Sequence, residues 1–91
     1  MRFRITRHST GSPPEEALEL LAERIGPRRS GISFARVGRE IRANIQRDDP
    51  VSMTSDERVD IARREVLDIV AEVCTPDSGL KLDWYAVSPA R

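Results

Sequence analysis

The sequence predicts an α+β domain in which three helices pack on a two-stranded sheet, in the order strand, helix, helix, helix, strand. Two stretches near the ends of the chain alternate between apolar and polar residues, which is typical of half-buried strands. Three stretches between them repeat apolar residues every three or four positions, which is typical of helices packed on a core. With 91 residues the chain is expected to form one small globular domain, residues 1–91.

The two strands are predicted at residues 2–8 and 80–87 and form the N- and C-terminal strands of the sheet. In the first, Phe3 and Ile5 alternate with polar residues. In the last, one face carries Leu80, Leu82, Trp84 and Ala86, and the other carries Lys81, Asp83, Tyr85 and Val87. No other strand is evident, so these two are expected to pair and to leave both outer edges open. A symmetric dimer that joins edge strands would cover such edges.

The first helix is predicted to begin at Ser12 and to end near Ile25. Ser12 is a candidate N-cap, since a proline follows it at the first helical position and Glu15 completes a capping box. Gly26 and the proline after it end the helix. Its apolar stripe comprises Leu18, Leu21, Ala22 and Ile25.

The second helix is predicted from about Ser33 to about Arg47. Its apolar stripe comprises Phe34, Val37, Ile41 and Ile45, and arginines occupy the opposite side. Gly38 lies inside this segment, where glycine costs up to about 1 kcal/mol relative to alanine. Close packing against a neighbouring helix is the expected reason for that glycine.

The third helix has the strongest signals of the three. Thr54 is a candidate N-cap, and Glu57 completes a capping box with acids in the first turn. Its apolar face comprises Val59, Ala62, Val66, Ile69, Val70 and Val73. Ile61 falls among the polar positions, and Leu67 lies at their margin.

Charge is unevenly distributed along a chain whose net charge is zero. Residues 1–47 carry ten arginines and five acids, whereas residues 48–91 carry five basic residues and ten acids. Such asymmetry predicts either a basic interaction surface or two parts that attract each other. Fourteen of the fifteen basic residues are arginines, which also agrees with a coding bias toward arginine.

The sequence gives little support for an enzyme, a cofactor or a metal. It holds one histidine, His8, and one cysteine, Cys74, which are too few for a zinc site. His8 and Cys74 could form a nucleophile pair, but an inert, buried cysteine is the better-supported interpretation of Cys74. Neither a membrane span nor a signal peptide is evident, so a cytoplasmic protein is expected.

Two surfaces are therefore predicted to carry function. The first is a protein interface, used with a protein partner or with a second copy in a homodimer, formed by Ile61, Leu67, Tyr85 and Val87. The alternative is a nucleic-acid-binding regulator that uses the arginine-rich helix 34–47 and its preceding loop, joined by Arg2 and Arg4. Its contacts would be Arg28, Arg29, Arg36, Arg39, Arg42 and Arg47. A third interpretation is that these arginines are solvated or pair with acidic helices.

Overall fold

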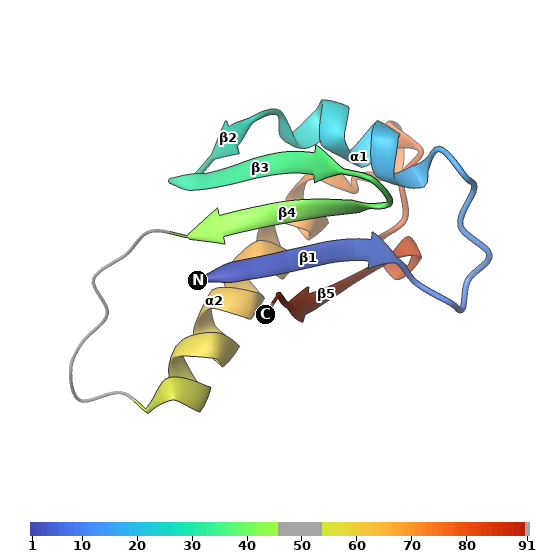
Figure 1. Cartoon of the computed structure of the whole chain (residues 1–91). Helices are drawn as coiled ribbons and strands as arrows, with labels where there is room; N and C mark the ends of the chain where they lie inside the picture. Colours follow the sequence, from blue (N-terminus) through green and yellow to red (C-terminus); the bar gives the residue numbers. More distant parts are fainter. Residues whose placement is uncertain (46–53, 91) are drawn as a thin grey trace.

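The computed structural model describes residues 1–45 and 54–90. They form one five-stranded antiparallel sheet with strand order β2-β3-β4-β1-β5, together with two α-helices and two short 3-10 helices (Figure 1). In chain order the elements are β1 Arg2–Arg7, α1 Ala17–Ile25, β2 Arg28–Arg29, β3 Ile32–Val37, β4 Glu40–Ile45, α2 Ser55–Val73, η1 Pro76–Ser78, η2 Leu82–Trp84 and β5 Tyr85–Pro89.

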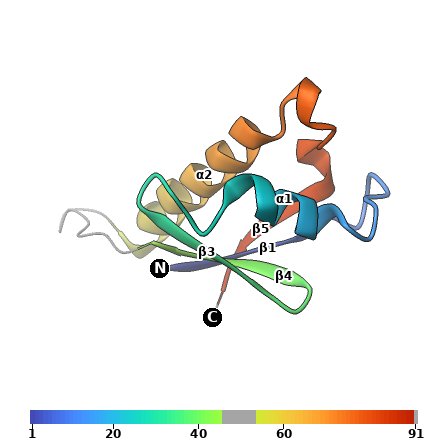
Figure 2. The same ribbon diagram turned by 90° about the horizontal axis from the view of Figure 1, so that it is seen from above.

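The domain has two layers, because both helices lie against the same face of the sheet (Figure 2). The core is formed between them by alternate residues of the strands and by the apolar stripes of α1 and α2. Its largest fully buried side chains are Phe3, Ile5, Leu21, Ile32, Ile41, Val66 and Val70. Neither α1 nor α2 covers the other face of the sheet.

The predicted helix at 33–47 is wrong in the described part of that segment, which is the β3–β4 hairpin. Val37 pairs with Glu40 across a two-residue turn formed by Gly38 and Arg39. Gly38 has φ +61°, as a type II′ turn requires at its first central position. The apolar residues therefore follow a period of two, with Ile32 and Phe34 in β3 and Ile41, Ala43 and Ile45 in β4 buried against the helices.

A second tight turn adds another strand to this hairpin. Ser30 and Gly31 have φ values of +52° and +78°, which is the pattern of a type I′ turn. They join β2 to β3, with Arg29 opposite Ile32. The segment that the sequence suggested was a basic loop thus belongs to the sheet.

The predicted pairing of the terminal strands is confirmed, but β1 also pairs with β4 on its other side. Ile5 lies opposite Ile41 in β4 and opposite Val87 in β5, and both pairings are antiparallel. The α+β class is therefore correct, whereas three helices on a two-stranded sheet is not. The hairpin supplies two strands in the segment where the sequence pattern predicts a helix.

The two helices agree with their predicted ends to different degrees. α2 begins as expected, because Thr54 Oγ1 accepts a hydrogen bond of 3.2 Å from the Glu57 backbone N–H. α1 ends as expected, where the Gly26 N–H donates to the Ala22 carbonyl oxygen. Its predicted start is wrong: the helix begins at Ala17, and Ser12 has φ +48°, outside the conformation of an N-cap.

The last strand is shorter than predicted, and its buried face is the opposite one. Residues 82–84 form the 3-10 turn η2, which interrupts the alternation between Leu80 and β5. Leu80 is consequently buried, as are Tyr85 and Val87, while Leu82 is 41% exposed. The Tyr85 hydroxyl donates a 2.7 Å hydrogen bond to the Ala17 carbonyl oxygen inside the core.

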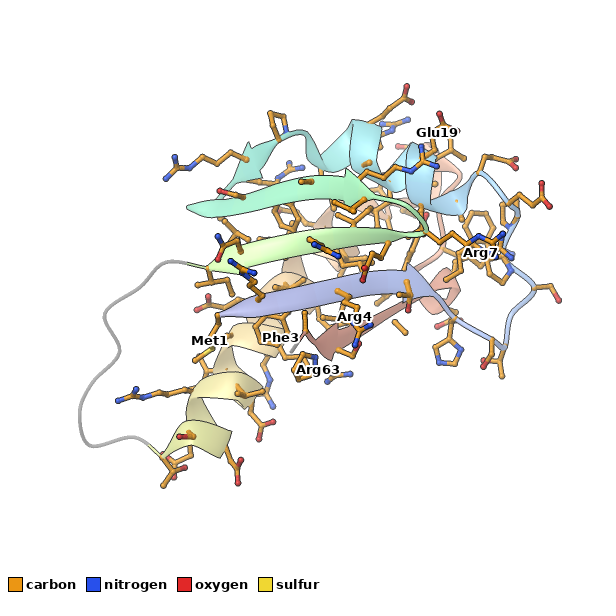
Figure 3. All side chains as sticks on the ribbon, in the orientation of Figure 1. Met1, Phe3, Arg4, Arg7, Glu19 and Arg63 are labelled. Carbon is orange, nitrogen blue, oxygen red and sulfur yellow. The ribbon has the colours of Figure 1, made fainter. Side chains whose placement is uncertain are left out.

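The outer edge of β5 is partly closed to another strand. His8 N–H donates to the Trp84 carbonyl oxygen and Ala90 N–H donates to that of Arg2, so the residues of β5 between them face β1 at alternate positions. The backbone groups of Tyr85, Val87 and Pro89 therefore point outward. The Tyr85 N–H donates a hydrogen bond to the Leu82 carbonyl oxygen, and Pro89 has no N–H. Arg63, labelled in Figure 3, donates from Nε to the Val87 carbonyl oxygen at 2.8 Å, so these groups are not available to another strand.

Candidate functional site

The two layers of the domain carry opposite charge. Residues 2–7 and 28–45, which include β1 to β4, contain eight arginines and one acid, Glu40. The helices α1 and α2 contain eight acids and four arginines. The charge asymmetry along the sequence thus becomes a basic sheet layer beneath an acidic helix layer.

The bare side of the sheet is called the open face here. It is formed by the residues of the five strands that alternate with the core positions. These are Arg2, Arg4 and Thr6 of β1, Arg28 of β2, Ser33, Ala35 and Val37 of β3, Glu40, Arg42 and Asn44 of β4, and Ala86 and Ser88 of β5. Most of them are small, so the arginines stand above a shallow surface. None of the described residues of this face is aromatic.

The centre of the open face is a cluster of two arginines and one acid. Arg4 and Arg42 are direct cross-strand partners, and their side chains are 48% and 55% exposed. Glu40 contacts both, with Oε2 at 3.8 Å from Arg4 Nε and Oε1 at 3.4 Å from Arg42 Nη2. Glu40 thereby relieves the repulsion between like charges placed directly opposite each other. Since one carboxylate faces two guanidinium groups, the cluster keeps a net positive charge.

A cavity of about 760 Å³ lies at the end of the sheet beyond this cluster. It is bounded by the end of β1, the segment that leads into α1, and the β3–β4 turn. Its basic lining consists of Arg7, Arg36 and Arg39, with His8 beside them. Thr6, Ser9 and Ser12 add hydroxyl groups, and Glu15 is the acid in the lining. Figure 3 shows Arg7 at the end of β1, beside that turn.

The arginines of the cavity differ in their partners. Arg36 Nη1 lies 3.7 Å from Glu19 Oε1 of α1, and both side chains are largely exposed. Arg7 and Arg39 make no ion pair with the part of the chain that the structure describes. His8 Nδ1 accepts a hydrogen bond of 3.1 Å from the Thr10 N–H, so the neutral ring carries its proton on Nε2.

The six arginines predicted for nucleic-acid binding do not share one surface. Arg28 of β2 lies opposite Ser33 at the edge of the open face, whereas Arg29 is on the helix side and pairs with Glu72. Arg47 lies outside the described residues. Arg36 and Arg39 border the cavity, and Arg42 is on the open face. The open face instead brings Arg42 together with Arg2 and Arg4. Sequence reasoning missed Arg7 and Glu40, although Glu40 would have been placed beside Arg42 by a strand period.

The four residues predicted for a protein interface are also separated. Tyr85 and Val87 are 5% and 3% exposed in the core, so the expectation that they lie on a surface is wrong. Ile61 is exposed on α2, and Leu67 is partly buried against the core. The exposed large apolar side chains, Met1, Leu20, Val37, Ile61 and Leu82, come from five separate segments.

Cys74 is poorly suited to the role of a nucleophile. Burial raises the pKa of the Cys74 thiol, which disfavours the thiolate that a nucleophile requires. The described residues contain no group of three or more His, Cys, Asp and Glu side chains that could hold a metal ion. No described helix is long and apolar enough to cross a bilayer.

Comparison with known proteins adds no further guide to the site. No family model, curated protein or solved structure matches this chain. The charge, exposure and geometry of the described residues therefore carry the functional argument.

Proposed function

We propose that this protein is a non-enzymatic module that binds the sugar–phosphate backbone of nucleic acids on the open face of its sheet. The observation that carries the proposal is the placement of Arg4 directly opposite Arg42, both exposed, on a face that neither helix covers. Glu40 relieves only part of the repulsion between these two like charges, so an anionic partner would stabilise the arrangement further.

The chemistry of the face suits phosphate groups. A guanidinium group offers a planar fork of donors that matches the oxygens of a phosphate. The small residues around the cluster, among them Ala35 and Ser88, leave room for a nucleic-acid backbone to approach the strands. The acidic helix layer repels the same ligand, which directs it to the sheet side of the domain.

Binding on this face is expected to depend strongly on salt and little on base sequence. Phe3, Phe34 and Tyr85 are buried and Trp84 packs partly against the core, so no aromatic ring is available there for base stacking. If Arg2, Arg4 and Arg42 each neutralise one phosphate, log affinity falls with log salt at a slope of about −3 for duplex DNA and about −2 for a single strand.

A protein interface, including a homodimer, stays a prediction. The partly closed outer edge of β5 argues against a strand-to-strand dimer through that edge. A dimer that stacked two open faces would bring the Arg4–Arg42 clusters of both copies together, which like-charge repulsion opposes. No specific observation on the described surface favours a protein partner over a polyanion.

The test is a fluorescence anisotropy titration with labelled duplex DNA and single-stranded RNA over a series of salt concentrations. The double variant Arg4→Gln, Arg42→Gln should weaken binding to both and reduce the duplex salt slope by about 2. The matched control is Arg24→Gln, Arg64→Gln, which removes two exposed arginines from the helices and should leave the slope unchanged. Absence of binding at low salt, or equal losses in both variants, would overturn the proposal.

A further inference from the structure

The antiparallel sheet brings three distant arginines to one cavity. Ile5 of β1 lies opposite Ile41 of β4, and Val37 of β3 lies opposite Glu40, so β1 and β3 end at the same end of the sheet. Arg7 closes β1 and Arg36 lies near the end of β3, while Arg39 is in the turn between β3 and β4. The convergence is a result of strand register, and residues 7 and 39 are far apart in the sequence.

The positive charge of the cavity lining exceeds the negative charge of the acidic side chains beside it, among the described residues. Its lining carries three arginines and one acid, Glu15, and the ion pair with Glu19 engages only Arg36. The hydroxyl groups of Thr6, Ser9 and Ser12 and the Nε2 proton of His8 are further donors. With Arg36 paired to Glu19 and Glu15 in the lining, the cavity offers several donors and a surplus of about one positive charge to one compact anion.

A phosphate monoester fits these properties better than a phosphodiester does. At neutral pH a monoester carries a charge of about −1.5 to −2 and presents three strong acceptor oxygens. A phosphodiester within a strand carries a single negative charge and has two bridging oxygens. The concave site at the end of the sheet can surround a terminal phosphate group, whereas the shallow open face contacts a strand from one side.

The cavity adjoins the open face. Thr6 alternates with Arg2 and Arg4 along β1 and also lines the cavity. Arg4 and Arg7 are three residues apart in β1, which is about 10 Å, and they point to opposite faces of the sheet. A strand on the open face therefore has to turn around the end of the sheet to place its terminal phosphate in the cavity.

We infer that the cavity binds the terminal phosphate of a nucleic-acid strand whose backbone lies on the open face. This inference rests on the proposed function and assigns the module to strand ends that carry a phosphate monoester. Arg7 and Arg39 hold the phosphate, and Arg2, Arg4 and Arg42 hold the adjoining backbone.

The test compares one single-stranded oligonucleotide in three forms: with a 5′-phosphate, with a 3′-phosphate, and with hydroxyl groups at both ends. Anisotropy titrations should show that at least one phosphorylated form binds about fivefold more tightly than the hydroxyl form, as expected for one added charge near a partner at about 4 Å in water. Equal affinities of all three forms would overturn the inference and leave backbone binding intact. Failure of all three to bind would instead overturn the proposed function.

Variants locate the effect within the molecule. Arg7→Gln, Arg39→Gln should abolish the preference for a phosphorylated end while changing the affinity for the hydroxyl form much less. Arg24→Gln, Arg64→Gln is the matched control, because it removes two exposed arginines from the helices and should preserve the preference. A preference that survives the cavity variant would contradict the assignment of these residues.

A mononucleotide distinguishes a strand end from a free ligand. Adenosine monophosphate, added in competition with the phosphorylated oligonucleotide, should bind more weakly than the oligonucleotide because it lacks contacts with the open face. Binding of adenosine monophosphate as tightly as the oligonucleotide would overturn the assignment to strand ends. Thermal unfolding of each variant checks that the fold is retained.

Discussion

The Tyr85 hydroxyl donates a 2.7 Å hydrogen bond to the backbone carbonyl oxygen of Ala17, sixty-eight residues away in the sequence. The bond joins the first residue of β5 to the first residue of α1 inside the core. Because both groups are buried, each would lose a partner without the other. Burial raises the pKa of Tyr85 to about 12, and the neighbouring Cys74 adds to the rise.

This shift predicts a loss of stability at high pH. A tyrosine in the unfolded chain ionises near pH 10, whereas folded Tyr85 keeps its proton until about pH 12. The contribution of the protonated Tyr85 hydroxyl to the free energy of unfolding is fully present below about pH 10. It is lost as the pH rises toward about 12. Urea unfolding across this window should show the loss. Tyr85→Phe should be less stable at neutral pH by about 1–3 kcal/mol and show a shallower decline above pH 10. If the free energies of unfolding of the unmodified protein and of Tyr85→Phe declined in parallel above pH 10, Tyr85 would not be the group responsible.

Gly38→Ala distinguishes the hairpin from the helix that the sequence predicted. At φ +61° a side chain is strained, although no atom lies within 4 Å of the added Cβ. We expect a loss of about 1–2 kcal/mol in the free energy of unfolding, measured by urea denaturation. In a helix the same substitution would instead raise the free energy of unfolding by up to about 1 kcal/mol. Ser30→Gly is the reverse change at a positive φ and should be neutral or stabilising.

Arg63→Ala should expose the edge of β5. The variant leaves the Val87 carbonyl oxygen without its side-chain donor, so unfolding should become easier by about 1 kcal/mol. Light scattering at increasing protein concentration should detect more self-association, since an open strand edge can pair with another copy. Arg64→Ala removes the same charge from the adjacent helical position and should do neither. A monomeric, fully stable Arg63→Ala variant would show that the edge is blocked by other means.

Glu40→Gln should change stability and binding in opposite directions. Loss of the carboxylate leaves Arg4 facing Arg42 without compensation, which should lower the free energy of unfolding by less than about 1 kcal/mol. The same change removes the negative charge from the open face. We therefore expect about fivefold tighter binding of duplex DNA at low salt, from about 1 kcal/mol at 4 Å in water. Weaker binding in anisotropy titrations would show that Glu40 contributes to the contact.

The elements that the sequence predicts well are those with local signals. Thr54 and the apolar stripe after it specify α2, because the cap and the period of 3.6 lie within one segment. Segment 33–45 is ambiguous, since Phe34, Ile41 and Ile45 fit both a helical stripe and alternate strand positions. The deciding signals are the turn dipeptides Ser30-Gly31 and Gly38-Arg39, but a single glycine such as Gly38 is also compatible with a helix interior.

The candidate site is less predictable, because it depends on pairing between distant segments. An excess of arginine in the first half of the chain is visible in the sequence. The placement of Arg4 opposite Arg42, however, follows from the register of β1 against β4, which the local pattern does not contain. In the same way, the η2 turn at Leu82–Trp84 reverses which face of the last strand is buried. No side-chain cap marks the start of that turn in the sequence.

The position of β1 between β4 and β5 makes the order of synthesis differ from the order of assembly. The β3–β4 hairpin needs only neighbouring residues and can form early, whereas β1 must close long loops to reach either partner. Phe3 and Ile5 therefore gain their last partner strand only after residues 85–89 have been synthesised, which is seconds after β1 itself at about 5–20 residues per second.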